Sequence, residues 1–171
     1  MSALPVTVPS LSSEVLEHLD LQLMSTRRLL ACVLAQGTAI RAQDVDAVLA
    51  RVSDIKTEMG VRASLEDQRR DLLVRSGQAL GLNPAAVTLE AMCTLMNPLE
   101  AQAARARSSE LRGLLAEIGR EHAINRALMR QELSFLDHML RLLGGEPQGA
   151  YTPSEPPSTT TPTLRALDLQ A

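Results

Sequence analysis

Residues 97–145 read NPLEAQAARARSSELRGLLAEIGREHAINRALMRQELSFLDHMLRLLGG, and this stretch decides the fold. Its residues recur at alternating intervals of three and four in the series Leu111, Leu114, Ile118, Glu121, Asn125, Leu128, Glu132, Phe135, Met139 and Leu142. That spacing places them on one face of an α-helix. Asn97 is a favourable N-cap and Glu100, three residues later, completes a capping box. The sequence therefore predicts one long helix from Pro98 to Leu143, stopped by the glycines that follow.

Two further helices are predicted before it. The first starts at Ser12 or Ser13 as N-cap and runs to about Gln36, where Gly37 is expected to end it. The second starts at Asp44 and finishes near Gly81. The three–four spacing of its apolar residues is interrupted beside Gly60, which predicts a bend or a change of packing partner there.

A short third helix is expected from Asn83-Pro84 to about Met96, because Asn caps a helix well and Pro fits its first position. Phe135 and Tyr151 are the chain's two aromatic residues, so the core must be aliphatic, which suits close-packed helices. The predicted class is all-α, an elongated antiparallel bundle of coiled-coil-like hairpins with a long C-terminal helix. We expect an extended arm over residues 1–10, a helical domain over 11–143 and a disordered Pro/Ser/Thr-rich tail over 144–171.

Charge and cysteine content limit the possible partners. The formal charge of -3 and the pI near 5.6 argue against nucleic acid as a partner, since phosphate binding needs a basic face. Cys32 and Cys93 are too few for a disulfide framework and indicate a reducing compartment. The N-terminal residues do not resemble a signal peptide, and no apolar run is long enough for membrane insertion. We therefore expect a cytoplasmic protein.

Enzymatic motifs are not found in the sequence. It contains no Gly-rich phosphate loop, no nucleophile elbow and no paired Cys motif, and none of its histidines follows a Glu at the spacing of a di-iron site. We predict no catalytic residues, no metal site and no cofactor.

The distal half of the long helix carries more apolar side chains than a two-stranded seam needs. Two tracks run side by side: Leu128, Phe135 and Leu142 beside Met129, Leu136 and Leu143, with Leu133, Met139 and Leu140 alongside. They either pack on the first helix or form a groove for another chain. Asn125 is either a polar contact that sets register inside a helix interface, or it lies on the rim of a seam made by Leu115, His122, Met129, Leu136 and Leu143.

Several stretches, taken in order, resemble the FlgN family of flagellar export chaperones over roughly Leu11 to Tyr151. They are Leu29-Leu30, Gln43 to Leu49 running on to Lys56, Arg70 to Leu73 leading to Leu80-Gly81-Leu82, Asn125 to Met129, Phe135 to Leu143, and Tyr151-Thr152-Pro153. After Pro153 this chain departs from the family pattern with extra Pro/Thr sequence and a Leu-containing end.

The resemblance implies a non-enzymatic cytoplasmic chaperone that holds hook-filament junction proteins before type III export. The client's C-terminal helical segment is expected to bind Asn125, Leu128, Met129, Glu132, Phe135, Leu136, Met139, Leu142 and Leu143. Tyr151 is expected to dock on the cytoplasmic domain of the export gate. Such a protein should be a monomer or a weak homo-oligomer. The alternative is a coiled-coil structural or adaptor protein that homodimerises through its last helix.

Overall fold

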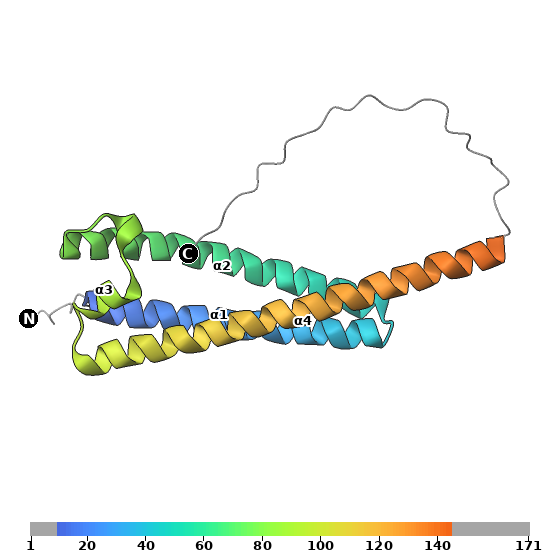
Figure 1. The fold of residues 1–171 in the computed structure, drawn as a ribbon, viewed down its shortest axis with the longest axis horizontal. Coiled ribbons are helices and arrows are strands. Elements are labelled where there is room, and N and C mark those ends of the chain that lie inside the picture. The colour runs from blue at the N-terminus through green and yellow to red at the C-terminus, as the bar shows by residue number, and fades with distance from the viewer. Residues whose placement is uncertain (1–9, 145–171) are drawn as a thin grey trace, which may run out of the picture. The chain divides into compact units, whose positions relative to one another are not determined.

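The computed structural model describes residues 10–144, and every regular element in that range is a helix. The order is α1 (Leu11–Arg41), α2 (Val45–Leu80), the 3₁₀ turn η1 (Pro84–Ala86), α3 (Leu89–Cys93) and α4 (Pro98–Gly144) (Figure 1). The chain divides into two units, residues 1–135 and 136–171. The all-α prediction is confirmed, whereas the arm over residues 1–9 and the tail after Gly144 lie outside the described residues.

Helix α1 is the central element of the first unit. It turns back into α2 through the connection at residues 42–44, and α2 packs against it in antiparallel orientation. Helix α4 runs parallel to α1, because Asp20, Arg27 and Val33 of α1 meet Arg107, Glu110 and Asn125 of α4 in the same order. Since both neighbours pack on it, α1 buries residues on two sides, among them Val15, Leu23, Leu29, Val33 and Ile40.

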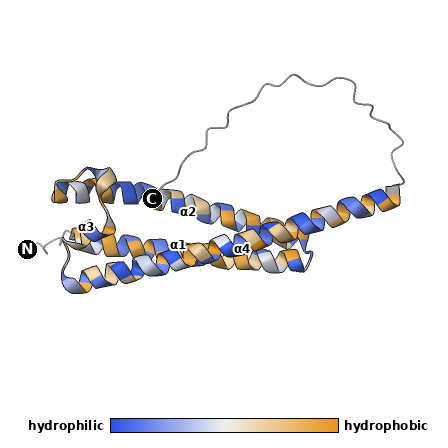
Figure 2. Ribbon diagram, viewed as in Figure 1, coloured by the Kyte–Doolittle hydropathy of each residue, from blue (hydrophilic) through white to orange (hydrophobic). Residues whose placement is uncertain are grey.

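Hydrophilic and hydrophobic residues are interleaved along the three long helices in Figure 2. Where α4 begins, Ala101 and Ala104 are buried together with Cys93 of α3, and Leu16 and Leu19 of α1 pack against them. Small side chains at these positions let α1 and α4 approach closely. Polar contacts then join α1 to α2: Arg62 donates to the buried Thr26 hydroxyl at 2.7 Å, and Arg28 pairs with Glu58 at 2.9 Å.

Several helix boundaries follow the sequence prediction. The Asp44 carboxylate caps α2 through the Ala47 amide at 2.9 Å, and Gly81 ends it with a left-handed φ of 68°. At the start of α4, Asn97 accepts from the Glu100 amide at 2.9 Å and Glu100 accepts from the Asn97 amide at 3.1 Å, which is the predicted capping box.

Other boundaries differ from the prediction. Ser10, not Ser12 or Ser13, caps α1, and the helix continues through Gly37 to Arg41. Helix α2 is continuous through Gly60, as predicted, and the bend or change of packing partner expected there stays a prediction. The predicted third helix is two short pieces, because Thr88 has an extended backbone and caps a new helix through the Ala91 amide at 3.1 Å.

Candidate partner-binding surface

The apolar face of α4 changes character along its length. From Ala101 to Glu132 the residues spaced by three and four are buried or half-buried against α1, including Leu111, Leu114, Ile118 and Leu128. From Leu133 onward every residue whose burial is described is exposed. The two uses predicted for this helix, packing on α1 and presenting a free face, therefore apply to successive parts of it.

Asn125 lies near this change and belongs to the packed part. It is 2 % exposed. Its amide donates to the Val33 carbonyl oxygen at 2.8 Å and to the Gln36 side-chain oxygen at 3.3 Å. Both partners are acceptors, so the amide nitrogen must face them. Asn125 is therefore the polar contact that sets register between α4 and α1, and the rim position considered for it is wrong.

Among the described residues, Glu132 makes the last hydrogen bond from α4 to the α1–α2 turn. Its carboxylate accepts from the Gln43 side chain at 3.1 Å, and Gln43 itself has a left-handed φ of 55°. Leu128, one turn earlier, is half-buried. Of the nine residues predicted for client binding, these two and Asn125 thus face the fold at least in part.

The other six predicted residues are exposed. Their exposed fractions are 40 % for Met129, 56 % for Phe135, 55 % for Leu136, 36 % for Met139, 66 % for Leu142 and 80 % for Leu143. Large apolar side chains left in water so close together on one helix are typical of an interaction surface. We call these six residues, with Leu133 and Leu140, the distal apolar face.

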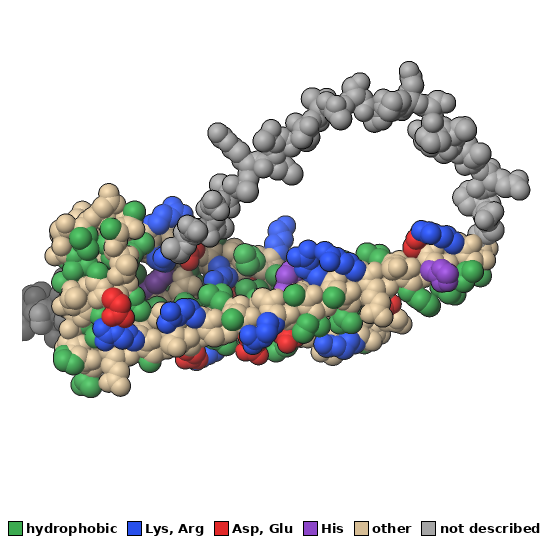
Figure 3. Space-filling model, in the orientation of Figure 1, with side chains coloured by type: hydrophobic (Ala, Val, Ile, Leu, Met, Phe, Trp, Pro, Cys, Tyr) green, Lys and Arg blue, Asp and Glu red, His purple; other side chains and the backbone are tan. Residues whose placement is uncertain are grey.

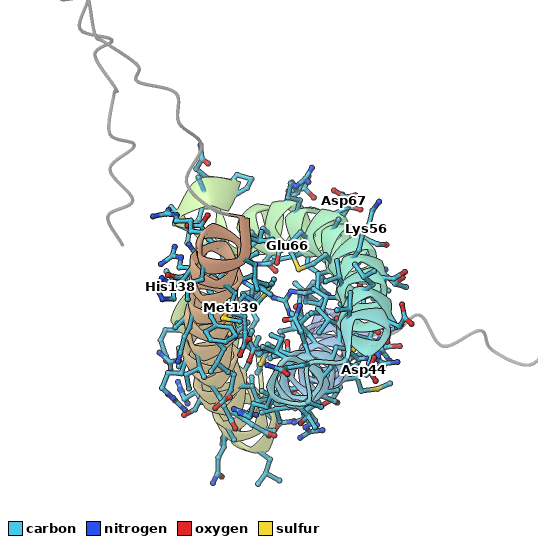
Figure 4. The ribbon with its side chains drawn as sticks, turned by 90° about the vertical axis from the view of Figure 1, so that its right-hand side faces the viewer. Asp44, Lys56, Glu66, Asp67, His138 and Met139 are labelled. Carbon is cyan, nitrogen blue, oxygen red and sulfur yellow. The ribbon has the colours of Figure 1, made fainter. Side chains whose placement is uncertain are left out.

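Leu133 and Leu140 were not among the predicted site residues. They are 65 % and 69 % exposed, and they continue the series Met129, Leu133, Leu136, Leu140 and Leu143 at intervals of four and three. The sequence had already placed both beside the two apolar tracks of the long helix, and this spacing could have added them to the predicted client-binding residues. In Figure 4, His138 and Met139 leave α4 in different directions, as neighbouring helical residues must. Tyr151 lies outside the described residues.

Charged side chains do not form a patch of one sign over the face drawn in Figure 3, where basic and acidic groups are interspersed with hydrophobic ones. Several are paired across elements: Arg107 with Asp20 at 2.6 Å, Arg27 with Glu110 at 2.5 Å and Arg105 with Glu90 at 2.7 Å. Hydrogen bonding to Arg105 lowers the pKa of the Glu90 carboxyl. These pairs are largely exposed, so each contributes little to stability.

Within residues 10–144, no three His, Cys, Asp or Glu side chains are grouped so that they could hold a metal ion. None of the helices in that range is both long and apolar enough to cross a membrane.

A family model described as FlgN protein matches residues 11–157. The chain belongs to the FlgN family. The match includes α1 to α4 and extends beyond them over Tyr151. No curated protein and no solved structure shows a significant match. The FlgN family consists of flagellar export chaperones, which are binding proteins rather than enzymes, so the general role of this chain is to chaperone flagellar proteins.

Proposed function

We propose that this FlgN protein binds the C-terminal helical segment of flagellar hook-filament junction proteins along the distal part of α4, and so prevents their premature assembly in the cytoplasm. The observation that supports the proposal is the change in burial at Leu133. Before this residue the apolar side chains of α4 pack on α1, and after it α4 still carries apolar side chains but they are exposed. An amphipathic helix of a client can cover such a face by the helix-in-groove mode of recognition.

The composition of the distal apolar face supports a helical client. Leu side chains supply most of the area, Phe135 supplies a rigid anchor, and Met129 and Met139 can adapt their shape to different side chains. Adaptable contacts suit a chaperone with more than one client. Glu132 and the buried Asn125 then fix the start of this face, because their bonds hold α4 on Gln43 of the α1–α2 turn and on Val33 of α1.

Delivery is the second part of the proposal. Tyr151 follows Leu143 by eight positions and lies within the family match, so client and export gate would contact neighbouring parts of one chain. Two weak contacts made by one molecule raise the local concentration of client at the gate.

The client contact is tested by replacing Phe135, Leu136 and Leu142 with Ser in the full chain. Each side chain contributes roughly 1.5–3 kcal/mol when fully buried, so affinity for a junction protein should fall at least about 100-fold by calorimetric titration. The matched control replaces Val45, Leu49 and Leu99, which are 68 %, 62 % and 79 % exposed, with Ser. The control should leave client affinity unchanged.

Two results would contradict the proposal. One is an equal loss of affinity in the control, and the other is loss of helicity in the Phe135, Leu136 and Leu142 variant, which would make these residues core. Sedimentation of the unsubstituted protein distinguishes the adaptor alternative, because a homodimerising adaptor would be a tight dimer that the same substitutions dissociate.

A further inference from the structure

A groove of about 490 Å³ lies in the first unit between α1, α2, the η1–α3 segment and α4. Its apolar lining comes from four parts of the chain: Leu19, Leu72, Leu73, Met92, Leu111 and Leu115. Leu115 is 39 % exposed and most of the others are half-buried, so a wall of apolar side chains faces the groove. None of the residues proposed to bind client lines it.

Few charged side chains line the groove, and each of them has a hydrogen-bonding or ion-pair partner. Arg62, Glu66 and Arg69 of α2 line it, and Glu66 is drawn toward the inner side of α2 whereas its neighbour Asp67 points outward (Figure 4). Arg69 and Glu66 pair at 3.3 Å and Arg62 donates to Thr26. The groove therefore offers no strong field to attract a charged ligand, and an uncharged apolar segment suits it better.

One buried polar atom at the groove lacks a partner among the described residues. His18 is 8 % exposed and lines the groove, and its Nδ1 atom makes no hydrogen bond there. Its Nε2 atom lies 3.4 Å from the amide nitrogen of Gln22, which is a donor, so Nε2 accepts and the ring proton is on Nδ1. A buried donor of this kind is expected to have an acceptor, and a main-chain carbonyl is the commonest one.

We propose that the N-terminal arm, residues 1–9, turns back at Ser10 and lies in this groove, with Leu4, Val6 and Val8 against its apolar wall and a main-chain carbonyl accepting from His18 Nδ1. The arm reads MSALPVTVP and contains no charged side chain. In an extended chain Leu4, Val6 and Val8 point to the same side. Pro5 and Pro9 lack amide donors but keep their carbonyl oxygens, so the arm can accept from His18.

The arm is long enough and correctly placed. The groove borders α1 from Val15 to Gln22, five to twelve residues beyond Ser10, which is about 8–18 Å along the helix. Nine extended residues span up to about 30 Å. Because the arm is joined to α1 beside the groove, its effective concentration there is in the millimolar range, which favours it over a second copy of the chain.

Methyl NMR of the full chain, labelled at Leu and Val, tests this inference. We expect nuclear Overhauser contacts from the methyl groups of Leu4, Val6 and Val8 to those of Leu73, Leu111 and Leu115. The double variant Leu4→Asp, Val6→Asp should lose them and shift the groove resonances. The matched control Ala3→Asp, Thr7→Asp adds the same charge on the opposite side of the arm and should retain them.

Absence of these contacts in the unsubstituted protein would overturn the inference, and so would equal loss in both variants. Contacts that appear only between differently labelled molecules would assign the groove to a second copy and would also overturn it. Because the four substitutions lie before α1, they leave the helices intact. The inference does not depend on the proposed client contact, and the variants used to test the two have no residue in common.

Discussion

The side-chain amide of Asn125 in α4 donates to the main-chain carbonyl of Val33 in α1 at 2.8 Å, across 92 residues of sequence. Both residues are 2 % exposed. A buried amide donor is costly to leave without an acceptor, so a shift of α4 along α1 that broke this bond would be unfavourable. This bond therefore fixes the register of α4 on α1, and with it the position on α4 at which the apolar face becomes exposed.

Asn125→Asp should destabilise the fold by about 3 kcal/mol or more near neutral pH, because a buried carboxylate would place an acceptor oxygen against the Val33 carbonyl oxygen in place of the amide donor. Asn125→Ala loses the bond without burying a charge and should cost roughly 1–2 kcal/mol. Urea unfolding followed by circular dichroism measures both. Equal costs for the two substitutions would show that the amide donor does not set the register.

Gly37→Ala should also destabilise, although Ala is the better helix former. A Cβ atom at Gly37 would lie 2.5 Å from Asn125 Oδ1, which has no room to move because its amide is bonded to Val33. The expected cost is about 1–3 kcal/mol. Gly113→Ala in α4 is the matched control, since its Cβ would meet nothing within 4 Å, and it should stabilise by about 0.5–1 kcal/mol.

The double variant tests the cause of the Gly37 effect. In the Asn125→Ala background the obstructing oxygen is gone, so Gly37→Ala should become neutral or stabilising. An unchanged cost in that background would mean that Gly37 is required for some other reason.

His18 should make stability depend on pH. Burial lowers the pKa of its imidazole below the ordinary value, Glu66 opposes that shift and Arg69 adds to it. Below the unfolded pKa of about 6.5 the unfolded state binds more protons than the native state. Neutral His18 therefore makes its full contribution to the free energy of unfolding above that pH. This contribution is lost as the pH falls from there through the lowered native pKa.

When unfolding free energies are measured from about pH 7.5 downward, the part due to His18 should be constant above about pH 6.5, decline below it, and become constant again once the pH is below the native pKa. His18→Gln keeps a polar side chain without a titrating group and should give the flatter profile. The carboxylates titrate in both proteins, so the difference between the two profiles isolates His18. Identical profiles would contradict a lowered native pKa.

The parts of the fold that local chemistry decides were predictable from the sequence. The capping box at Asn97 and Glu100, the Asp44 cap and the left-handed Gly81 need only neighbouring residues, and the structure shows each of them. The spacing of apolar residues on α4 likewise predicted its length and face.

Tertiary contacts decided the features that the sequence did not predict. Gly37 was expected to end a helix, but it lies inside α1. A glycine is needed at this position because the side chain of Asn125, 88 positions later, occupies the space that a Cβ atom would fill. The boundary between the packed and exposed parts of α4 also depends on residues distant in sequence. Its periodicity is continuous past Glu132, so only the position of α1 shows which part is packed and which is exposed.

Tyr151→Ala should weaken binding to the cytoplasmic domain of the export gate while leaving client affinity unchanged. Tyr151 follows Leu143 by eight residues, which can span at most about 28 Å, so its ring could reach the gate without displacing a client from α4. An aromatic anchor of this kind is typically worth at least about 2 kcal/mol, which predicts a loss of gate affinity of roughly 30-fold. Thr152→Ala, at the next position, is the matched control. Paired titrations of both variants with client and with the gate domain separate the contacts, and unaltered gate affinity in Tyr151→Ala would exclude this residue as the anchor.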